Sequence, residues 1–450
     1  MILAAAPAHV QAGVGKADHT LADATTASGW PAAPETDAEF VFAMELNSGT
    51  VLYDKGGEES CFPASTTKTM TALLTLENCD LDEEVTFSYN AVHDIENGGH
   101  HYEFQEGEVL TVDECLQFLL VESVNECAYA LAEHVAGDVD TFVDMMNAKA
   151  QELGAYDTHF NNPHGLNDED HYTTAHDMAM ILWGCIQDPR FQQYADIQSI
   201  SLKGHAIMTS GFQSYTNHHE MILYGNSNYD TDVVCGKTGF TSIAGSTLVT
   251  YGHRDDMDVI VVIMQGEDQK RFSDTKAVLD YAFDNFELVS AQEVSEELLR
   301  EDISGLSLGT EIDEEQVLLL PVNGGRDALT SEFTPRSEED TDLSVLGTRT
   351  WYYDGVEVGS STVTLAQKST SSYVSEEESA EGQTSTSRKT FAFGLTRGEF
   401  LVILVLSALL IVLLLIMLRI LHVKRERRRI AKRRRERAAK LREAERRGRR

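Results

Sequence analysis

The sequence predicts an α+β fold, in which an antiparallel sheet packs against helices, and three observations carry the prediction. Two segments with hairpin patterns lie far apart in the chain, at residues 38–54 and 243–264. Apolar residues at helical spacing fill much of the stretch between them, over residues 65–187. A further helical pattern follows the second hairpin, over residues 270–286. Strands on both sides of a helical region are typical of an α+β domain.

Turn residues mark the two hairpins. The first hairpin joins residues 38–45 to 51–54 through Asn47-Ser48-Gly49, and these residue types readily adopt the backbone conformations of tight turns. The second joins residues 243–251 to 257–264 through the polar segment His253-Arg254-Asp255-Asp256. We therefore expect both segments to supply strands of an antiparallel sheet.

Two helix starts between the hairpins have clear signals. Pro63 and Ala64 precede a run of apolar residues at helical spacing, so we expect a helix to begin at Ser65. Thr174 and Asp177 form a capping-box pattern, which predicts a helix over residues 175–186. The predicted elements from residue 31 to residue 287 make up one domain.

The composition changes after this domain. Short apolar runs alternate with turns over residues 288–366, which predicts a small β domain. Residues 367–398 are rich in Ser, Thr and Glu and are expected to form a flexible linker. Residues 400–418 carry no charge and can cross a bilayer core of about 30 Å, so we expect a single transmembrane helix over residues 399–421. A basic tail follows, over residues 422–450.

The charge distribution gives this chain an orientation in a membrane. Residues 419–450 contain 17 Lys or Arg and four Glu, a net charge of +13. Because the whole chain has a net charge of −37, residues 1–418 have a net charge of −50. Positive charge stays on the cytoplasmic side, which places the tail inside and the acidic part outside a bacterial cell membrane. We expect the tail to bind anionic lipid in preference to nucleic acid, and the acidic part argues against nucleic-acid binding there.

The N-terminus does not have the pattern of a complete signal peptide. Residues 1–8 contain no basic residue and only a short apolar stretch, although Ala6-Pro7-Ala8 is similar to the small-residue end of a signal peptide. We interpret residues 1–30 as the remnant of a truncated signal peptide whose main part lies upstream in the reading frame.

Cysteine and histidine residues give no metal or cofactor pattern. The six cysteines all lie between residues 61 and 235, and a domain of this size does not require a disulfide framework. Their connectivity stays open. The chain has 15 histidines, but it contains neither H-E-x-x-H nor C-x-x-C. We therefore expect no cofactor and no catalytic metal.

Three short motifs in a fixed order predict nucleophilic catalysis. They are Ser65-Thr66-Thr67-Lys68, Ser123-Val124-Asn125 and Lys237-Thr238-Gly239. A serine hydroxyl needs a base to remove its proton, and a lysine three residues later on a helix lies on the same face. Lys68 can act as that base if burial and a second cation, Lys237, lower its pKa. The backbone N–H of Ser65 can then stabilise an oxyanion.

Two of the three motifs have a second copy that we set aside. Ser273-Asp274-Thr275-Lys276 repeats the S-x-x-K pattern, but it follows the single K-T-G and has no later partner motif. Ser88-Tyr89-Asn90 repeats S-x-N, but Ser123 lies between two helical patterns. We expect the second copies to be structural.

The ordered motifs resemble the active site of the penicillin-recognising serine acyltransferases. Several longer segments narrow the resemblance to the low-molecular-mass D-alanyl-D-alanine carboxypeptidases of peptidoglycan metabolism, peptidase family S11. The segments are residues 63–74, 122–132, 162–166, 171–177 and 236–241. The resemblance implies a β-lactamase/transpeptidase-like form of the α+β fold and covers about residues 38–287.

The resemblance also implies a role for each motif residue in the hydrolysis of a stem peptide that ends in D-Ala-D-Ala. Ser65 attacks the peptide carbonyl and Lys68 takes its proton. Ser123 passes a proton to the leaving D-alanine, while Asn125 holds Lys68 and the substrate amide. The remaining residues bind the substrate carboxylate or complete the oxyanion hole, namely Lys237, Thr238, Gly239, Phe240 and Thr241. β-Lactams acylate the same serine.

The chain departs from the family pattern at two positions. Family members often carry an arginine in the segment that corresponds to Thr216-Asn217-His218-His219-Glu220, where this chain has none. We expect a weaker anion site, to which His218 contributes a charge at low pH if it faces the site. Phe240 stands where His is common, and only its backbone is needed for the oxyanion.

Two alternative functions stay open from the sequence. One is a non-catalytic wall-binding or sporulation-related scaffold of the same fold, against which the intact motifs speak. The other is a β-lactamase, but no E-x-x-L-N follows Ser123, so we expect a penicilloyl ester to persist.

Overall fold

The computed structural model describes residues 29–93, 102, 104–202, 213–291, 293–294, 310–312, 316–337 and 345–365. The chain divides into two compact units, residues 1–368 and 369–450, and all described residues belong to the first. The predicted linker, transmembrane helix and basic tail lie outside the described residues, as do residues 1–28. Within the described ranges no helix is long and apolar enough to cross a bilayer.

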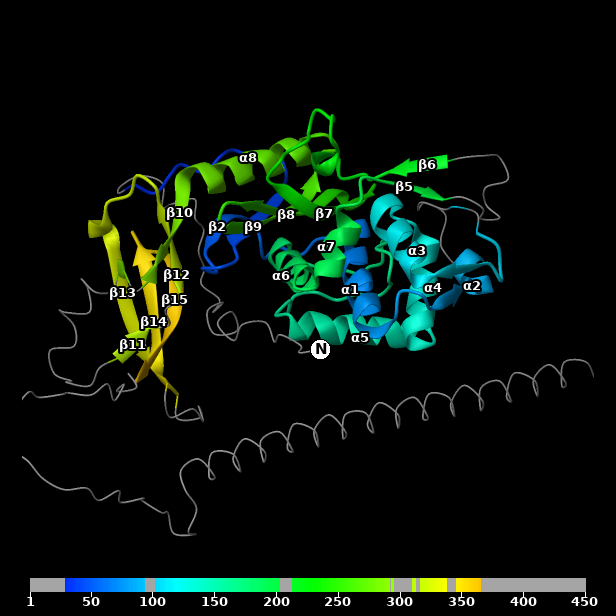
Figure 1. The fold of residues 1–450 in the computed structure, drawn as a ribbon, viewed down its shortest axis with the longest axis horizontal. Coiled ribbons are helices and arrows are strands. Elements are labelled where there is room, and N and C mark those ends of the chain that lie inside the picture. Colours follow the sequence, from blue (N-terminus) through cyan, green and yellow to red (C-terminus); the bar gives the residue numbers. More distant parts are fainter. Residues whose placement is uncertain are drawn as a thin grey trace, which may run out of the picture. The chain divides into compact units, whose positions relative to one another are not determined.

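A five-stranded antiparallel sheet forms the centre of the larger domain, in the order β2-β1-β9-β8-β7 (Figure 1). Both predicted hairpins are confirmed: β1 (Phe40–Glu45) pairs with β2 (Val51–Lys55), and β8 (Gly245–Arg254) pairs with β9 (Met257–Gly266). The hairpins meet where β1 pairs with β9, with Phe42 opposite Val262. The edge strand next to β8 is β7 (Val233–Thr241), which carries the K-T-G motif.

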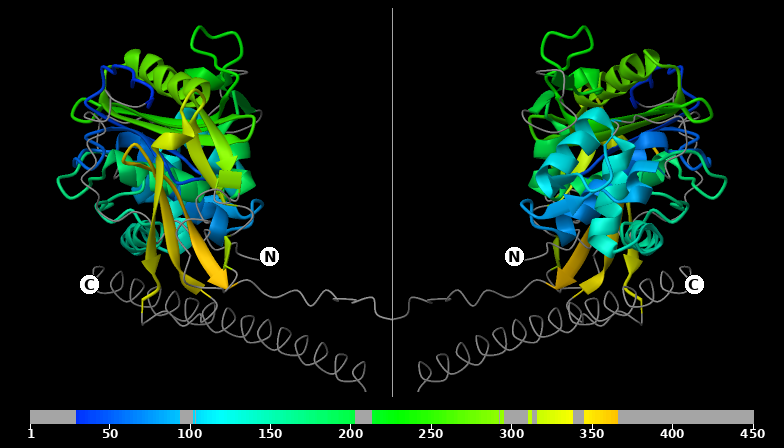
Figure 2. Two further views of the ribbon diagram at one scale, coloured as in Figure 1. Left: turned by 90° about the vertical axis from the view of Figure 1, so that its left-hand side faces the viewer. Right: turned by 90° about the vertical axis from the view of Figure 1, so that its right-hand side faces the viewer.

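Alternating side chains give the sheet two apolar faces. Val41 and Val261 face a core that includes Phe272 of α8 (Lys270–Asn285). Phe42 and Val262 face the opposite core, which contains the other helices. Successive strand residues point to opposite sides, so one sheet can separate two cores. Figures 1 and 2 show α8 along one face of the sheet and the remaining helices on the other.

The helical layer contains most of the segment between the hairpins. Its helices are α1 (Lys68–Asn78), α2 (Tyr89–His93), α3 (Val112–Gln117), α4 (Asn125–Ala136), α5 (Val139–Glu152), α6 (Ala175–Ile186) and α7 (Pro189–Ala195). Short antiparallel pairs join β3 (Glu84–Thr86) to β4 (Val109–Thr111) and β5 (Ser199–Leu202) to β6 (Gln213–Thr216). A 3₁₀ turn, η4 (Glu220–Ile222), precedes β7.

Two predicted helix starts differ in detail from the structure. Ser65 lies in a 3₁₀ turn, η2 (Ala64–Thr67), and the α-helix begins only at Lys68. The tighter turn is held by Thr66, whose hydroxyl donates to the carbonyl of Pro63. The helix at residues 175–186 is confirmed, with Thr174 accepting from the backbone N–H of Asp177. The Asp177 carboxylate, however, accepts from Thr158.

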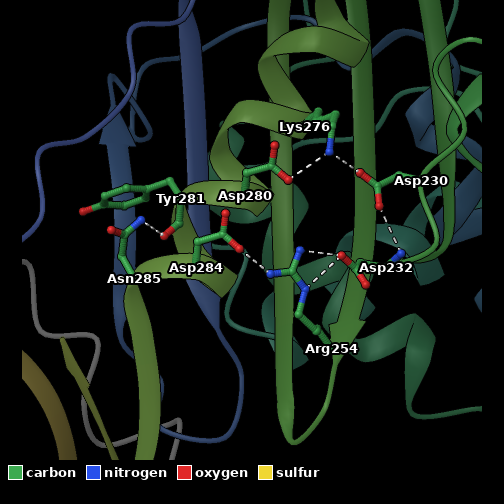
Figure 3. A network of polar contacts seen from close by, with 8 residues as sticks. All are labelled: Asp230, Asp232, Arg254, Lys276, Asp280, Tyr281, Asp284 and Asn285. Carbon is green, nitrogen blue, oxygen red and sulfur yellow. Dashed lines mark hydrogen bonds and ion pairs between the residues drawn. The ribbon is translucent and has the colours of Figure 1, made fainter. Parts of the chain in front are cut away.

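Ion pairs fasten the outer helix α8 to the strands beneath it (Figure 3). Lys276 contacts Asp230 and Asp280, each at 2.9 Å. Arg254 of β8 contacts Asp232 and Asp284, each at 2.6 Å. Lys276 of the second S-x-x-K is thus part of a structural network, as expected.

The predicted small β domain is also present. A four-stranded antiparallel sheet has the order β11-β15-β14-β13, formed by β11 (Thr310–Ile312), β13 (Leu329–Pro335), β14 (Val345–Tyr353) and β15 (Val356–Leu365). β10 (Phe286–Ser290) pairs separately with β12 (Val317–Pro321), and a 3₁₀ turn, η5 (Arg326–Ala328), precedes β13. Trp351, Tyr353 and Leu318 are buried in its core, and Trp30 packs against Tyr353.

Candidate active site

Ser65 stands on a turn that several contacts hold in place. Its side chain is partly exposed, whereas its neighbours Ala64 and Thr66 are buried. The Pro63 carbonyl accepts a hydrogen bond from the Thr66 hydroxyl and a second one, of 3.0 Å, from the Thr247 hydroxyl of β8. The nucleophile candidate is therefore fixed to the central sheet and still open to solvent.

Lys68 lies within reach of Ser65 and of two further acceptors. Its Nζ is 3.0 Å from Ser65 Oγ, 2.7 Å from Asn125 Oδ1 and 2.6 Å from the carbonyl oxygen of His164. The side chain is fully buried. Burial lowers its pKa well below the usual value, and the charge on Lys237 lowers it further, while Glu126 acts in the opposite direction. A neutral amine beside a serine hydroxyl can accept its proton.

Ser123 sits at an unusual backbone position between the two helices that the sequence predicted. A π-helical turn, η3 (Phe118–Glu122), ends at Ser123, whose φ of 61° lies in the left-handed region. This conformation is costly for a residue with a side chain and is found at functional sites. Ser123 Oγ is buried and has no hydrogen-bond partner among the described residues, while Asn125 begins α4.

The glycine of K-T-G allows β7 to lie against the nucleophile. A Cβ atom at Gly239 would stand 2.8 Å from the backbone nitrogen of Ser65 and 2.4 Å from Thr247 Oγ1, closer than packing allows. Because β7 is an edge strand, alternate backbone groups lack a partner in the sheet. The Ser65 N–H therefore lies beside a strand edge that can receive an extended peptide or an oxyanion.

A second buried cation follows on the same strand. The side chain of Lys237 is buried, and its Nζ donates to the carbonyl of Thr238 at 2.9 Å. Burial lowers the pKa of Lys237 to about 7, the charge on Arg271 adds to this shift, and Glu122 opposes it. Thr238 is buried next to it.

Arg271 is a cation at this site that the sequence analysis missed. It extends from α8, its Nη1 donates to the carbonyl of Gly239 at 3.2 Å, and its Nη2 lies 3.3 Å from Asp268. Its Nε is buried without a hydrogen-bond partner in the described part of the chain. Residues 216–220 contain no arginine, as expected, but α8 brings a guanidinium to β7 from a distant part of the chain. No local signal links α8 to β7, because their contact is tertiary.

The remaining predicted binding residues have different surroundings. The Thr241 hydroxyl donates to Asn167 at 2.8 Å, so its single proton already has an acceptor. Phe240 is 63% exposed. His218 lies 3.6 Å from Glu122, the residue before Ser123, so it faces the S-x-N segment.

The turn at residues 162–166 packs against the backbone of the turn that carries Ser65. Gly165 has a φ of +89°, and a Cβ there would stand 1.8 Å from the carbonyl oxygen of Ala64. Asn162 holds the turn by accepting from the backbone N–H of Gly165 at 2.7 Å. This packing brings the His164 carbonyl to Lys68.

His171 contacts Thr67, a residue of the turn that carries Ser65. Its Nδ1 accepts from the backbone N–H of Asn161, so its Nε2 carries the proton and donates to Thr67 Oγ1 at 2.9 Å. Burial lowers the pKa of His171 to about 3, which keeps the ring neutral. His171 lies in one of the segments that carry the family resemblance, residues 171–177, but the sequence pattern predicts no role for it.

Comparisons with known proteins point in one direction. Residues 27–268, just over half of the chain, match the peptidase S11 family, described as D-alanyl-D-alanine carboxypeptidase. The chain is 31% identical over 263 residues to D-alanyl-D-alanine carboxypeptidase DacF of Bacillus subtilis, covering 56% of this chain and 63% of DacF. It is 28% identical over 342 residues to DacA of Escherichia coli K12, covering 72% of this chain and 82% of DacA.

A solved structure extends the likeness to the fold. Penicillin binding protein 5 from Haemophilus influenzae is 23% identical, with a TM-score of 0.59, and the match covers 74% of this chain and 98% of that protein. This coverage includes the small β domain.

Proposed function

The chain belongs to the peptidase S11 family of serine-type D-alanyl-D-alanine carboxypeptidases, and on this premise we propose that it removes the terminal D-alanine from peptidoglycan stem peptides through an ester on Ser65. The observation that carries the proposal is the 3.0 Å separation of Ser65 Oγ from the buried, low-pKa amine of Lys68. A nucleophile beside a base that a third group orients is the arrangement that acyl transfer requires.

In the proposed acylation step, Ser65 Oγ bonds to the carbonyl carbon of the penultimate D-alanine as its proton moves to Lys68 Nζ. The oxyanion forms beside the Ser65 N–H and the strand edge at Phe240. Collapse of the intermediate breaks the peptide bond, and the leaving nitrogen takes a proton through Ser123. Ser123 Oγ suits this role because it is buried near the site and makes no other hydrogen bond within the described residues.

Deacylation reverses the roles. Water gives its proton to the neutral amine of Lys68 and bonds to the ester carbon, and Ser65 Oγ leaves with a proton from the same group. Asn125 keeps Lys68 in position throughout, since its Oδ1 lies 2.7 Å from the amine.

Lys237, Thr238 and Arg271 are proposed to hold the substrate carboxylate. A guanidinium can grip a carboxylate with two parallel hydrogen bonds, and a lysine supplies a point charge. Arg271→Lys keeps the charge but removes the planar fork, so we expect KM for a D-Ala-D-Ala peptide to rise while penicillin acylation stays measurable. An unchanged KM would remove Arg271 from the anion site.

One experiment tests the whole proposal. The purified full-length protein is incubated with a penicillin and examined by mass spectrometry, while D-alanine release from a D-Ala-D-Ala peptide is followed in parallel. We expect a stable adduct on Ser65 together with D-alanine release. An adduct without release would favour the scaffold, and rapid turnover of the penicillin would favour a β-lactamase.

The membrane location is part of the same proposal. The uncharged run at residues 400–418 and the basic tail support a single C-terminal anchor with the catalytic domain outside a bacterial cell membrane. Protease added to intact spheroplasts should remove the catalytic domain and leave an epitope at residue 450 intact. Loss of that epitope before lysis would contradict this topology.

A further inference from the structure

A group of metal-binding side chains lies away from the candidate active site. Within the described ranges, the ligand atoms of Cys79, Glu83 and His134 lie within 4.8 Å of one another. Glu83 Oε2 is 3.1 Å from His134 Nε2. These groups come from three places in the sequence, so their meeting is a product of the fold. We propose that Cys79, Glu83 and His134 form a binding site for a zinc ion.

The donor set fits zinc. Thiolate, imidazole and carboxylate are the usual zinc ligands, with bonds of about 2.0–2.3 Å. Tetrahedral bonds of that length place ligand atoms about 3.3–3.7 Å apart, so the present separations need only small side-chain rotations. Three protein ligands leave the fourth position to water. A hard ion such as magnesium would prefer oxygen ligands alone.

The ligands are already oriented and reachable. Glu83 Oε1 accepts from the backbone N–H of Asp80 at 2.9 Å, which leaves Oε2 directed at His134. Such a hydrogen bond to a ligating carboxylate is common around metal ions. The side chains of His134 and Glu83 are 20% and 45% exposed, and Cys79 is partly buried. A metal ion can therefore enter from solvent.

The local charge favours a dication. Residues 77–84 contain five acidic side chains and no basic one. Of the two cations near the end of α1, Lys149 contacts Glu77 of this segment and also Glu152, and Arg190 contacts Asp188. The acidic side chains of residues 77–84 outnumber these cations, so the bound ion would face a net negative surface.

The position of the site gives it a consequence for the active site. α1 and α4 pack together, and Lys68 and Asn125 join their first residues at 2.7 Å. Cys79 ends α1, about 16 Å along the helix, and His134 lies in the last turn of α4. Zinc would therefore join the far ends of the two helices that carry Lys68 and Asn125, and stabilise the helical layer.

Binding is a ligand exchange without oxidation. The zinc ion loses water, the S–H proton of Cys79 passes to the buffer, and a Zn–S bond forms. No other co-reactant is needed.

Cobalt is the probe for the test, because a thiolate bound to Co²⁺ absorbs in the near ultraviolet. Reduced, metal-free full-length protein is titrated with Co²⁺ and then with Zn²⁺. We expect a charge-transfer band that saturates at one equivalent and disappears when zinc displaces cobalt. Cys79→Ser should abolish the band, and His134→Gln should weaken binding at least about tenfold.

Two controls separate binding from folding. His253→Gln removes a comparable surface histidine, 2.9 Å from Asp258, and should leave the titration unchanged. Penicillin acylation of Ser65 should survive in Cys79→Ser, which shows that the variant is folded. Zinc should raise the Tm of the wild type and of His253→Gln but not that of Cys79→Ser. A titration without the band, or a band that persists in Cys79→Ser, would overturn the proposal.

Discussion

Two segments of this chain share the pattern S-x-x-K and have opposite surroundings. Lys68 is fully buried and lies 3.0 Å from Ser65 Oγ. The Lys276 side chain is 52% exposed and contacts Asp230 and Asp280, while Ser273 donates to the carbonyl of Lys270. Burial and a neighbouring cation lower the pKa of Lys68, whereas two carboxylates raise that of Lys276.

The difference shows that spacing alone creates no catalyst. Ser65 and Lys68 meet because a 3₁₀ turn leads into α1, and the amine donates to the uncharged oxygens of Asn125 and His164. In α8 the same spacing leaves the lysine in solvent, where carboxylates keep it charged. A charged lysine cannot accept a proton from serine.

The largest expected effect distinguishes the two serines. Ser65→Ala should lower D-alanine release and penicillin labelling by at least about 10⁴-fold, because no other group can form the ester. Ser273→Ala should leave both unchanged. Release assays and mass spectrometry of the two variants measure this directly. Retained release in Ser65→Ala would mean that the nucleophile is another residue.

The two lysines should differ almost as much. Lys68→Ala should slow acylation at neutral pH by about 10²–10⁴-fold, the usual contribution of a positioned base, while the fold stays intact. Lys276→Ala should acylate normally and lose about 1–3 kcal/mol of stability, because its pair with exposed Asp280 contributes little while its removal takes a cation from the buried carboxylate of Asp230. Stopped-flow acylation and thermal unfolding separate the two effects. Acylation near the wild-type rate in Lys68→Ala would assign proton removal elsewhere.

A smaller effect should follow from a methyl group at Gly239. Its Cβ would stand 2.8 Å from the Ser65 backbone nitrogen, so β7 or the turn must shift. A displacement of about 1 Å can cost on the order of 10²-fold in rate, and we expect Gly239→Ala to lose that much in kcat/KM. Gly325→Ala is the control, since a Cβ there meets nothing within 4 Å. Equal activity in both variants would show that the close approach is not needed.

The smallest expected effects concern pH and salt at the anion site. The pKa of Lys237 is about 7, so its charge, and with it the capture of an anionic substrate, should decline as pH rises through 7. Added salt should weaken capture in the same way. His218, if its charge acts on the site, should add a few-fold increase in kcat/KM at the acid end of the pH range.

The ratio of kcat/KM between wild type and His218→Ala, measured from pH 5.5 to 8, isolates that residue because the other titrating groups cancel. A ratio that does not change with pH would exclude His218 from the anion site and leave Lys237, Thr238 and Arg271.

Much of this protein could be predicted from local patterns. Alternation and turn residues located both hairpins, and helical spacing with Thr174 located the helix at residues 175–186. The order of the three motifs identified the family, which the match over residues 27–268 confirms. These features depend on residues a few positions apart, and short-range sterics and hydrogen bonds control them.

The sequence by itself determined the fold class, the family and the identity of the motif residues, while the tertiary structure decided what surrounds them. Arg271 contacts the carbonyl of Gly239 because α8 packs on the central sheet, and His171 supports Thr67 across 104 residues. The left-handed backbone of Ser123 follows from the π turn before it. Burial and charge at a site are sums over segments far apart in the chain, so they exist only once the chain has folded.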